Sequence, residues 1–180
     1  MKIVVFGRPG SGKTTLSLRI ARELGLPLFH VDKLYFEKGW KKRDHASYMR
    51  DIEKAVSSES WIIEGNSMKS LAYRYERADI AFYCCLPRMT CFYRIVRRWL
   101  TTRGRDKEDG PAGARNTISL RLIAYLWRFE TRYRDVINEL RSNHSKTAYL
   151  EIRSKREMEN AYAVITALRR KVASRAPRFS

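Results

Sequence analysis

The fold is decided at residues 7–14, which read Gly7-Arg8-Pro9-Gly10-Ser11-Gly12-Lys13-Thr14 and match the phosphate-binding pattern G-x-x-x-x-G-K-[ST]. Residues 2–6 precede this stretch as an apolar, β-branched run with the length of a buried strand. Residues 15–24 follow it and place Leu16, Ile20 and Leu24 at helical spacing. The motif therefore has the strand before it and the helix after it that such a loop requires.

The composition of this loop suits the binding of a nucleotide triphosphate. Its three glycines permit backbone angles that turn several N–H groups inward around a phosphate, and the following helix adds its unsatisfied N–H groups and positive dipole end. Lys13 is expected to reach the β and γ phosphates, and the Thr14 hydroxyl to ligate Mg²⁺. The predicted nucleotide-binding set in this region is Gly7, Arg8, Pro9, Gly10, Ser11, Gly12, Lys13, Thr14 and Thr15.

The length of 180 residues and the hydrophobic fraction of 44% fit a single domain spanning residues 1–180. The longest apolar run, residues 80–86, has the length of a strand, so no membrane partner is expected. Gly7 interrupts the first apolar run too early for a signal peptide. The three cysteines fit reduced thiols better than a disulfide framework. We therefore expect a cytoplasmic protein, with no prediction of its oligomeric state.

The net charge of +18 is the unusual feature of the composition, and it favours anionic partners such as nucleotides, nucleic acids or anionic surfaces. Eight basic residues lie in residues 88–115 and eight more in residues 153–178. If contiguous on the surface, they could follow a DNA backbone. Lid chemistry would equally explain the first cluster, and a solvated helix and tail would explain the second.

Strand-like and helical segments alternate along the chain. Strands are predicted at 2–6, 28–31, 61–63, 80–86 and 146–152, and helices at 15–24, 44–56, 67–77, 88–100, 117–141 and 157–171. This alternation predicts an α/β fold in three layers, a five-stranded parallel sheet with helices on both faces. Ligands should bind beyond the carboxyl ends of the strands. The polar stretch 102–115 is predicted to be a lid or a disordered loop.

Two acidic residues follow predicted strands at this edge. Asp32 follows residues 28–31 and Glu64 follows residues 61–63, which places both on the ligand side with the loop at 7–14. A role in the site is favoured for Asp32 over that of a capping residue. The connection 33–43 carries Tyr35, Phe36 and Trp40 among lysines. These rings would either hold a planar base or form a small apolar cluster.

Several motifs taken together resemble one group of kinases. They are HVDKL at 30–34 with Gly-Trp at 39–40, WIIEGN at 61–66, ERAD at 76–79, LPR at 86–88, the arginines between 94 and 103, and LEIRS at 150–154. With the loop at 7–14, the chain resembles the P-loop nucleotide kinases over most of its length. Within these it resembles the adenylate-kinase-related DNA topology modulation proteins.

The resemblance implies an ATP- and Mg²⁺-dependent kinase with the P-loop NTPase sheet order 2-3-1-4-5, an acceptor-binding insert at about 33–60 and a basic lid at about 100–116. It implies that Glu64 holds Mg²⁺ through water beside Thr14, and that Asp32 orients or deprotonates the acceptor. Arg94, Arg98 and Arg103 resemble the arginines that close on the transferring phosphoryl group. The turn that lies against the adenine in this family is matched by Arg153 and Ser154. The predicted catalytic residues are Lys13, Asp32, Arg94, Arg98 and Arg103.

The leading hypothesis is therefore phosphoryl transfer from ATP to a small acceptor, a nucleotide or another small metabolite. One alternative is a nucleotide-dependent DNA-binding protein, which the net charge motivates, although no DNA-reading motif is recognised in the sequence. The other is a P-loop hydrolase or switch without an acceptor, against which Asp32 and the lid arginines argue. The sequence does not identify the acceptor.

Overall fold

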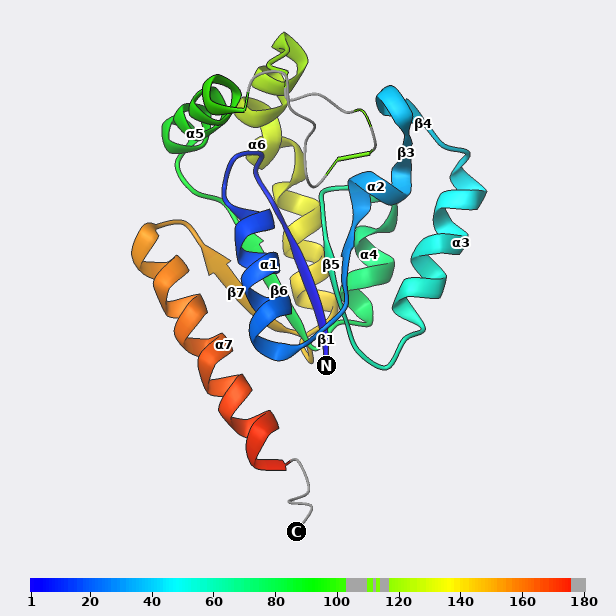
Figure 1. Ribbon diagram of the computed structural model, residues 1–180, viewed down its shortest axis with the longest axis vertical. Coiled ribbons are helices and arrows are strands. Elements are labelled where there is room, and N and C mark those ends of the chain that lie inside the picture. The colour runs from blue at the N-terminus through cyan, green and yellow to red at the C-terminus, as the bar shows by residue number, and fades with distance from the viewer. Residues whose placement is uncertain (103–109, 112, 114–116, 176–180) are drawn as a thin grey trace.

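A computed structural model describes residues 1–102, 110–111, 113 and 117–175 of the chain (Figure 1). Five parallel strands form its central sheet in the order β2-β5-β1-β6-β7. Counted along the chain within this sheet, the order is the predicted 2-3-1-4-5. The strands are β1 (Lys2–Gly7), β2 (Leu28–His30), β5 (Trp61–Glu64), β6 (Ile80–Cys84) and β7 (Ala148–Ile152).

The alternating side chains of β1 define the two faces of the sheet. Ile3 and Val5 pack in the core under α1 and α7, whereas Val4 and Phe6 pack on the opposite side under α3, α4 and α6. The three layers confirm the predicted α/β architecture (Figure 1). The covering helices are α1 (Lys13–Leu24), α7 (Lys155–Arg175), α3 (His45–Val56), α4 (Met68–Glu76) and α6 (Leu120–Asn143).

The helix α5 (Arg88–Thr101) lies above the carboxyl edge of the sheet, beside the start of α6 (Figure 1). Cys91 and Ile95 of α5 pack in a small core with Leu86 and with Leu126 of α6. This core fixes α5 next to the loop that follows β1. Helix α5 and the start of α6 therefore stand together beyond the carboxyl edge of the sheet (Figure 1).

The segment 31–43 differs from the predicted strand end and loop. It forms a short helix α2 (Val31–Tyr35), then β3 (Phe36–Glu37), a 3-10 turn η1 (Lys38–Trp40) and β4 (Lys41–Lys42), with β3 and β4 pairing as an antiparallel hairpin. The strand β2 ends at His30, so the prediction that Val31 lies in the strand is wrong. The chain turns into α2 here because Val31 is buried against Gly65, where an added Cβ would lie 2.6 Å from the Val31 Cβ.

Smaller differences in boundaries have local causes. The helix α6 begins at Leu120, three residues later than predicted, because the Ser119 side chain accepts a hydrogen bond from the Leu122 N–H at 3.1 Å and caps it. The strand β7 begins at Ala148, because the Thr147 N–H donates to the His144 carbonyl at 3.1 Å and not to the neighbouring strand. Among the described residues, no helix has the length and apolar character needed to cross a membrane.

Candidate functional site

The loop between β1 and α1 packs so closely that two of its glycines have no space for a side chain. Gly7 has a φ of 134°, and a Cβ there would lie 2.0 Å from the Cys84 carbonyl oxygen. Gly10 has a φ of 75°, and its Cβ would lie 2.5 Å from the carbonyl oxygen of Cys91 in α5. The shape of the loop is therefore fixed between β6 and α5.

Lys13 folds back over this loop. Its Nζ donates to the Arg8 carbonyl at 3.1 Å, while Gly12, with a φ of 93°, forms the N-cap of α1. The ammonium group and the N-terminus of a 12-residue helix thus lie within one turn of each other. The Ser11 hydroxyl is buried and has no hydrogen-bond partner among the described protein atoms. Pro9 and Thr14 are half-buried at the loop, and Thr15 is exposed.

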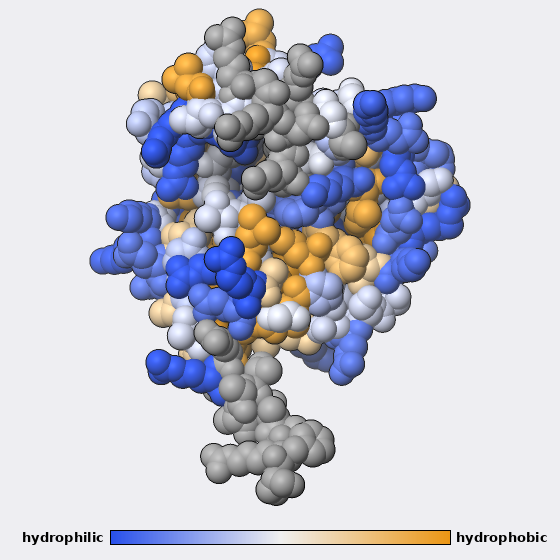
Figure 2. Space-filling model, in the orientation of Figure 1, coloured by the Kyte–Doolittle hydropathy of each residue, from blue (hydrophilic) through white to orange (hydrophobic). Residues whose placement is uncertain are grey.

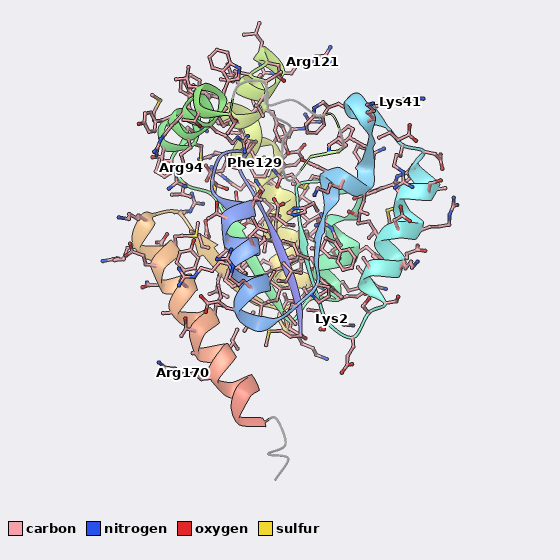
Figure 3. All side chains as sticks on the ribbon, viewed as in Figure 1. Lys2, Lys41, Arg94, Arg121, Phe129 and Arg170 are labelled. Carbon is pink, nitrogen blue, oxygen red and sulfur yellow. The ribbon has the colours of Figure 1, made fainter. Side chains whose placement is uncertain are left out.

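Two of the three predicted arginines project from α5. Arg94 donates from NH1 to the Ser11 carbonyl at 3.4 Å, and the same nitrogen lies 3.3 Å from the position of a Cβ at Gly12 (Figure 3). Arg98 is exposed one helical turn further along the same side of α5. Arg103 and most of the predicted lid at 100–116 lie outside the described residues. Within the part of the chain that the structure describes, Arg94 is the predicted arginine that contacts the loop.

The turn after β5 is joined to the loop by a side chain whose role was not predicted. The Gly7 N–H donates to Asn66 Oδ1 at 2.9 Å, and the Gly65 N–H donates to the Val5 carbonyl at 3.0 Å. Glu64, 5% exposed, has Oε2 3.0 Å from Nδ1 of His30 at the end of β2. The carboxyl ends of β1, β2 and β5 therefore meet around Glu64, as the sequence predicts.

Arg74 of α4 braces this turn and is itself fully buried. Its NH2 donates to the carbonyl oxygens of Gly65 at 3.3 Å and Ser67 at 3.1 Å, and its Nε donates to Ser70 Oγ at 3.1 Å. Ser70 Oγ in turn lies 2.5 Å from the hydroxyl of Tyr48 in α3. A continuous set of hydrogen bonds therefore runs from α3 through Arg74 to the turn that holds the loop.

Burial disfavours the charged form of the Arg74 guanidinium. Burial lowers the pKa of the Arg74 guanidinium to about 10, although the neighbouring Tyr48 and Glu64 act to raise it. Its NH1 is buried and has no hydrogen-bond partner among the described protein atoms. A buried arginine in this position is supported mainly by main-chain oxygens of the turn that it holds.

Asp32 lies in the first turn of α2 and is half-buried. The pKa of the Tyr125 phenol in α6 is raised first by burial, then by Tyr133, and further by the negative charge of Asp32. Asp32 therefore faces the region between β2 and α6. It stands beyond the carboxyl end of β2, on the ligand side, even though it belongs to a helix and not to the end of the strand.

The aromatic residues of the insert form a cluster. The ring centroids of Tyr35 and Tyr48 are 4.9 Å apart, those of Tyr35 and Phe36 are 4.8 Å apart, and those of Phe36 and Trp40 are 5.2 Å apart. Tyr35 packs against the main core under α3. This supports the interpretation of these rings as a small apolar cluster over that of a site for a planar base. Next to this cluster is an open cavity of about 380 Å³, lined by Lys33, Phe36, Lys38, Gly110 and Pro111.

Arg8, although part of the predicted nucleotide-binding set, turns its side chain into the protein. Its NH1 donates to the Leu86 carbonyl, and its NH2 donates to Glu130 Oε2 of α6 at 2.7 Å. The other oxygen, Glu130 Oε1, accepts from NH1 of Arg153 at 2.9 Å. Glu130, which the sequence did not identify, thus links the loop to the turn after β7.

The turn after β7 is held by a capping box. The N–H groups of Arg153 and Ser154 donate to Glu157 Oε2 at 2.6 and 2.9 Å, and Ser154 Oγ accepts from the Glu157 N–H at 3.2 Å. Met158, one residue further, has its terminal methyl 3.7 Å from the position of a Cβ at Gly12. The predicted pair Arg153 and Ser154 therefore lies beside the loop at 7–14.

Comparison with known proteins gives a partial family match and a complete structural one. The model of the ATPase family associated with various cellular activities (AAA) matches residues 3–77, which run from β1 and the loop through α4. No significant match to a curated protein is found. The matched part is less than half of the chain, and it includes the glycine loop at residues 7–14 with the strand before it and the helix after it.

Solved structures that resemble nearly the whole chain include small-molecule kinases. A shikimate kinase from Acinetobacter baumannii in complex with shikimate has a TM-score of 0.57 at 13% identity, covering 98% of this chain and 96% of its own. The shikimate kinase from Bacteroides thetaiotaomicron has a TM-score of 0.55 at 16% identity, covering 96% and 98%. A deoxyadenosine kinase from M. mycoides with bound dATP has a TM-score of 0.52 at 15% identity, covering 96% and 100%. The fold is that of the P-loop kinases.

Proposed function

We propose that the protein is an ATP-dependent phosphotransferase of the nucleotide-kinase type, which moves the γ-phosphoryl group of ATP to a small acceptor. The observation that carries the proposal is the convergence of Lys13 and Arg94 on the glycine loop, with contacts of 3.1 Å to Arg8 O and 3.4 Å to Ser11 O. Phosphoryl transfer requires mainly positioning and positive charge around the transferred group. These two cations and the start of α1 supply such charge at one place.

ATP would lie with its phosphates on the backbone of residues 7–15. The side chain of Arg8 is committed to Glu130, so we assign only its backbone to the nucleotide. The nucleoside would extend toward Arg153 and Ser154, because Met158, in the first turn of α7 directly after them, lies against Gly12. The net charge of +18 would attract a polyanionic substrate, and hydrophilic side chains are spread over much of the face shown in Figure 2.

Thr14 and Glu64 are the residues that would hold Mg²⁺, Glu64 through water. Among the described residues, no group of three or more His, Cys, Asp or Glu side chains is arranged to bind a metal. This fits Mg²⁺ bound with a nucleotide, since Mg²⁺ commonly keeps several waters and uses one or two protein oxygens with substrate phosphates. When bound, the ion would neutralise negative charge on the phosphates.

Asp32 would orient or deprotonate the acceptor, and Arg94, Arg98 and Arg103 would close on the transferring group. The acceptor would bind at the insert of residues 33–60, under a lid formed by residues 100–116 of a single domain. Shikimate, deoxyadenosine and gluconate are reasonable candidates, because the similar structures include a shikimate, a deoxyadenosine and a gluconate kinase. The motifs also lead us to place the chain with the adenylate-kinase-related DNA topology modulation proteins, as a cytoplasmic enzyme.

The test is turnover of MgATP in the presence of nucleoside monophosphates, nucleosides, shikimate, gluconate and other small hydroxylated compounds, with detection of both ADP and the phosphorylated product. We expect one acceptor class to give product in proportion to ADP. ADP without product from any acceptor would refute the kinase proposal in favour of a hydrolase or switch. Binding of DNA that weakens steeply with salt, without product formation, would favour the DNA-binding alternative.

A further inference from the structure

Glu130 connects the two ends of the proposed nucleotide site. Its Oε2 accepts from Arg8 of the phosphate loop at 2.7 Å, and its Oε1 accepts from Arg153 of the turn after β7 at 2.9 Å. We propose that Glu130 is a positioning residue that fixes Arg153 relative to the phosphate loop. Through this contact, the protein binds ATP more tightly than it binds a triphosphate that has no nucleoside. This inference rests on the proposed function.

The two ion pairs of Glu130, one with Arg8 and one with Arg153, differ in burial. The side chain of Arg8 is 3% exposed and that of Glu130 is 17% exposed, whereas the Arg153 side chain is 52% exposed. Arg8 also donates to the Leu86 carbonyl, so both of its terminal nitrogens are held inside the protein. The Arg8 side chain is therefore fixed in the interior, whereas the Arg153 guanidinium lies at the surface, where a ligand can contact it.

The charges of these ion pairs reinforce each other. A hydrogen bond from Arg153 lowers the pKa of Glu130 despite its burial, and Arg8 lowers it further. Burial acts to lower the pKa of Arg153, but Glu130 and Glu151 raise it above its ordinary value. Glu130 and Arg153 are therefore both charged at neutral pH, so their ion pair is maintained there.

The backbone of the turn is held in place independently of Glu130. It directly follows β7, which pairs with β6 in the sheet, and the N–H groups of Arg153 and Ser154 both donate to Glu157 at the start of α7. What Glu130 positions is therefore the Arg153 guanidinium, whose NH1 it holds while Glu151 accepts from its Nε. A planar guanidinium held in place can stack on a nucleobase without a further loss of side-chain entropy.

The direct test compares the binding of two probes, MgATP and magnesium tripolyphosphate, by isothermal titration calorimetry. For Glu130→Gln we expect about tenfold weaker binding of ATP, but a change of less than about threefold for tripolyphosphate, because only the nucleoside side is displaced. Glu139→Gln is the matched control, since Glu139 is exposed on the same helix. It should bind both probes like the wild type.

A double-mutant cycle tests whether Glu130 acts through Arg153. If it does, Glu130→Gln and Arg153→Gln each reduce the preference for ATP, and the double variant binds ATP no more weakly than Arg153→Gln alone. Additive losses, or a folded Glu130→Gln protein that keeps the wild-type preference, would overturn the inference. If Glu130→Gln does not fold because Arg8 is left buried without its partner, Arg153→Gln decides, and an unchanged preference there overturns it. A wild-type protein that binds neither probe would refute the proposed function as well.

Discussion

Arg74→Met replaces the fully buried guanidinium of α4 with an apolar side chain of similar length. Burial lowers the pKa of Arg74 to about 10, which corresponds to roughly 3 kcal/mol against the charged form in the folded protein. This penalty is fully present at neutral pH and shrinks only as the pH rises through about 10. Four contacts of 3.1–3.3 Å to Gly65, Ser67 and Ser70 offset it by roughly 4 kcal/mol. The charge and its hydrogen bonds therefore nearly cancel.

Arg74→Met removes both the cost of burying the charge and the hydrogen bonds, and it adds buried apolar surface. We therefore expect the free energy of unfolding of Arg74→Met, measured by urea denaturation, to lie within about 2 kcal/mol of the wild type. Arg74→Ala leaves a cavity and should lose about 2–5 kcal/mol. Arg77→Met is the control, because Arg77 is exposed just beyond the end of the same helix, and it should change stability by less than about 0.5 kcal/mol.

Arg74→Met should also bind MgATP about tenfold more weakly than the wild type does. The reason is that Asn66 Oδ1, which accepts the Gly7 N–H at 2.9 Å, stands on the turn that Arg74 holds. Calorimetric titration of MgATP into the folded variant measures this effect. Wild-type affinity in Arg74→Met would refute the inference that Arg74 supports the phosphate loop, and a stability loss above about 5 kcal/mol would refute the near-cancellation.

Three other features of the site give measurable outcomes. Lys13→Ala should reduce phosphoryl-transfer turnover by on the order of 10² to 10³, and a near-wild-type rate would exclude Lys13 as the main phosphate contact. Gly10→Ala should lower thermal stability more than Gly25→Ala. Both glycines have a positive φ, but an added Cβ meets Cys91 O at 2.5 Å only at Gly10, while Gly25 has nothing within 4 Å; equal losses would contradict this packing. Glu130 has a lowered pKa in the folded state, so its contribution is present above its ordinary value of 4.5 and is lost as the pH falls below it. Stability measured from about pH 5 to pH 3 should therefore fall more steeply in the wild type than in Glu130→Gln, and parallel curves would contradict the ion pairs.

The sheet and the phosphate loop could be predicted because their signals are local. An apolar strand, a glycine loop with Lys13 and a helix with Leu16 and Ile20 occupy consecutive residues, and both side-chain periods are visible in the sequence. The acidic residue Glu64 could also be placed, because the ends of parallel strands share one edge of the sheet. The structure brings Glu64 to that edge, beside His30.

The insert after β2 was harder to predict because its conformation depends on distant packing. Val31 reads as the last residue of a strand, yet it starts α2 because it is buried against Gly65, which lies 34 residues later in the chain. Tyr35 likewise packs on Tyr48 of α3. Short segments of this kind carry too few residues for a periodic pattern to decide between strand, helix and turn.

The two arginines of the interior could not be assigned from the sequence. Arg8 matches a variable position of the loop, and only the fold brings it to Glu130, 122 residues away. Arg74 lies in a short amphipathic helix, where a charged residue normally faces water. Each arginine is held in the interior by an oxygen atom outside its own element, Glu130 Oε2 for Arg8 and the Gly65 carbonyl for Arg74.

The 24-residue helix α6 gives the Glu130 contact a mechanical meaning. At a rise of about 1.5 Å per residue, Glu130 stands roughly 15 Å from the start of α6 and roughly 20 Å from its end. The far end is embedded in the core through Ile137 and Leu140, whereas the start is at the surface with Leu120 86% exposed. Because Leu126 of α6 packs with Cys91 and Ile95 of α5, a displacement of α5 would be transmitted along α6 to Glu130 and from there to Arg8.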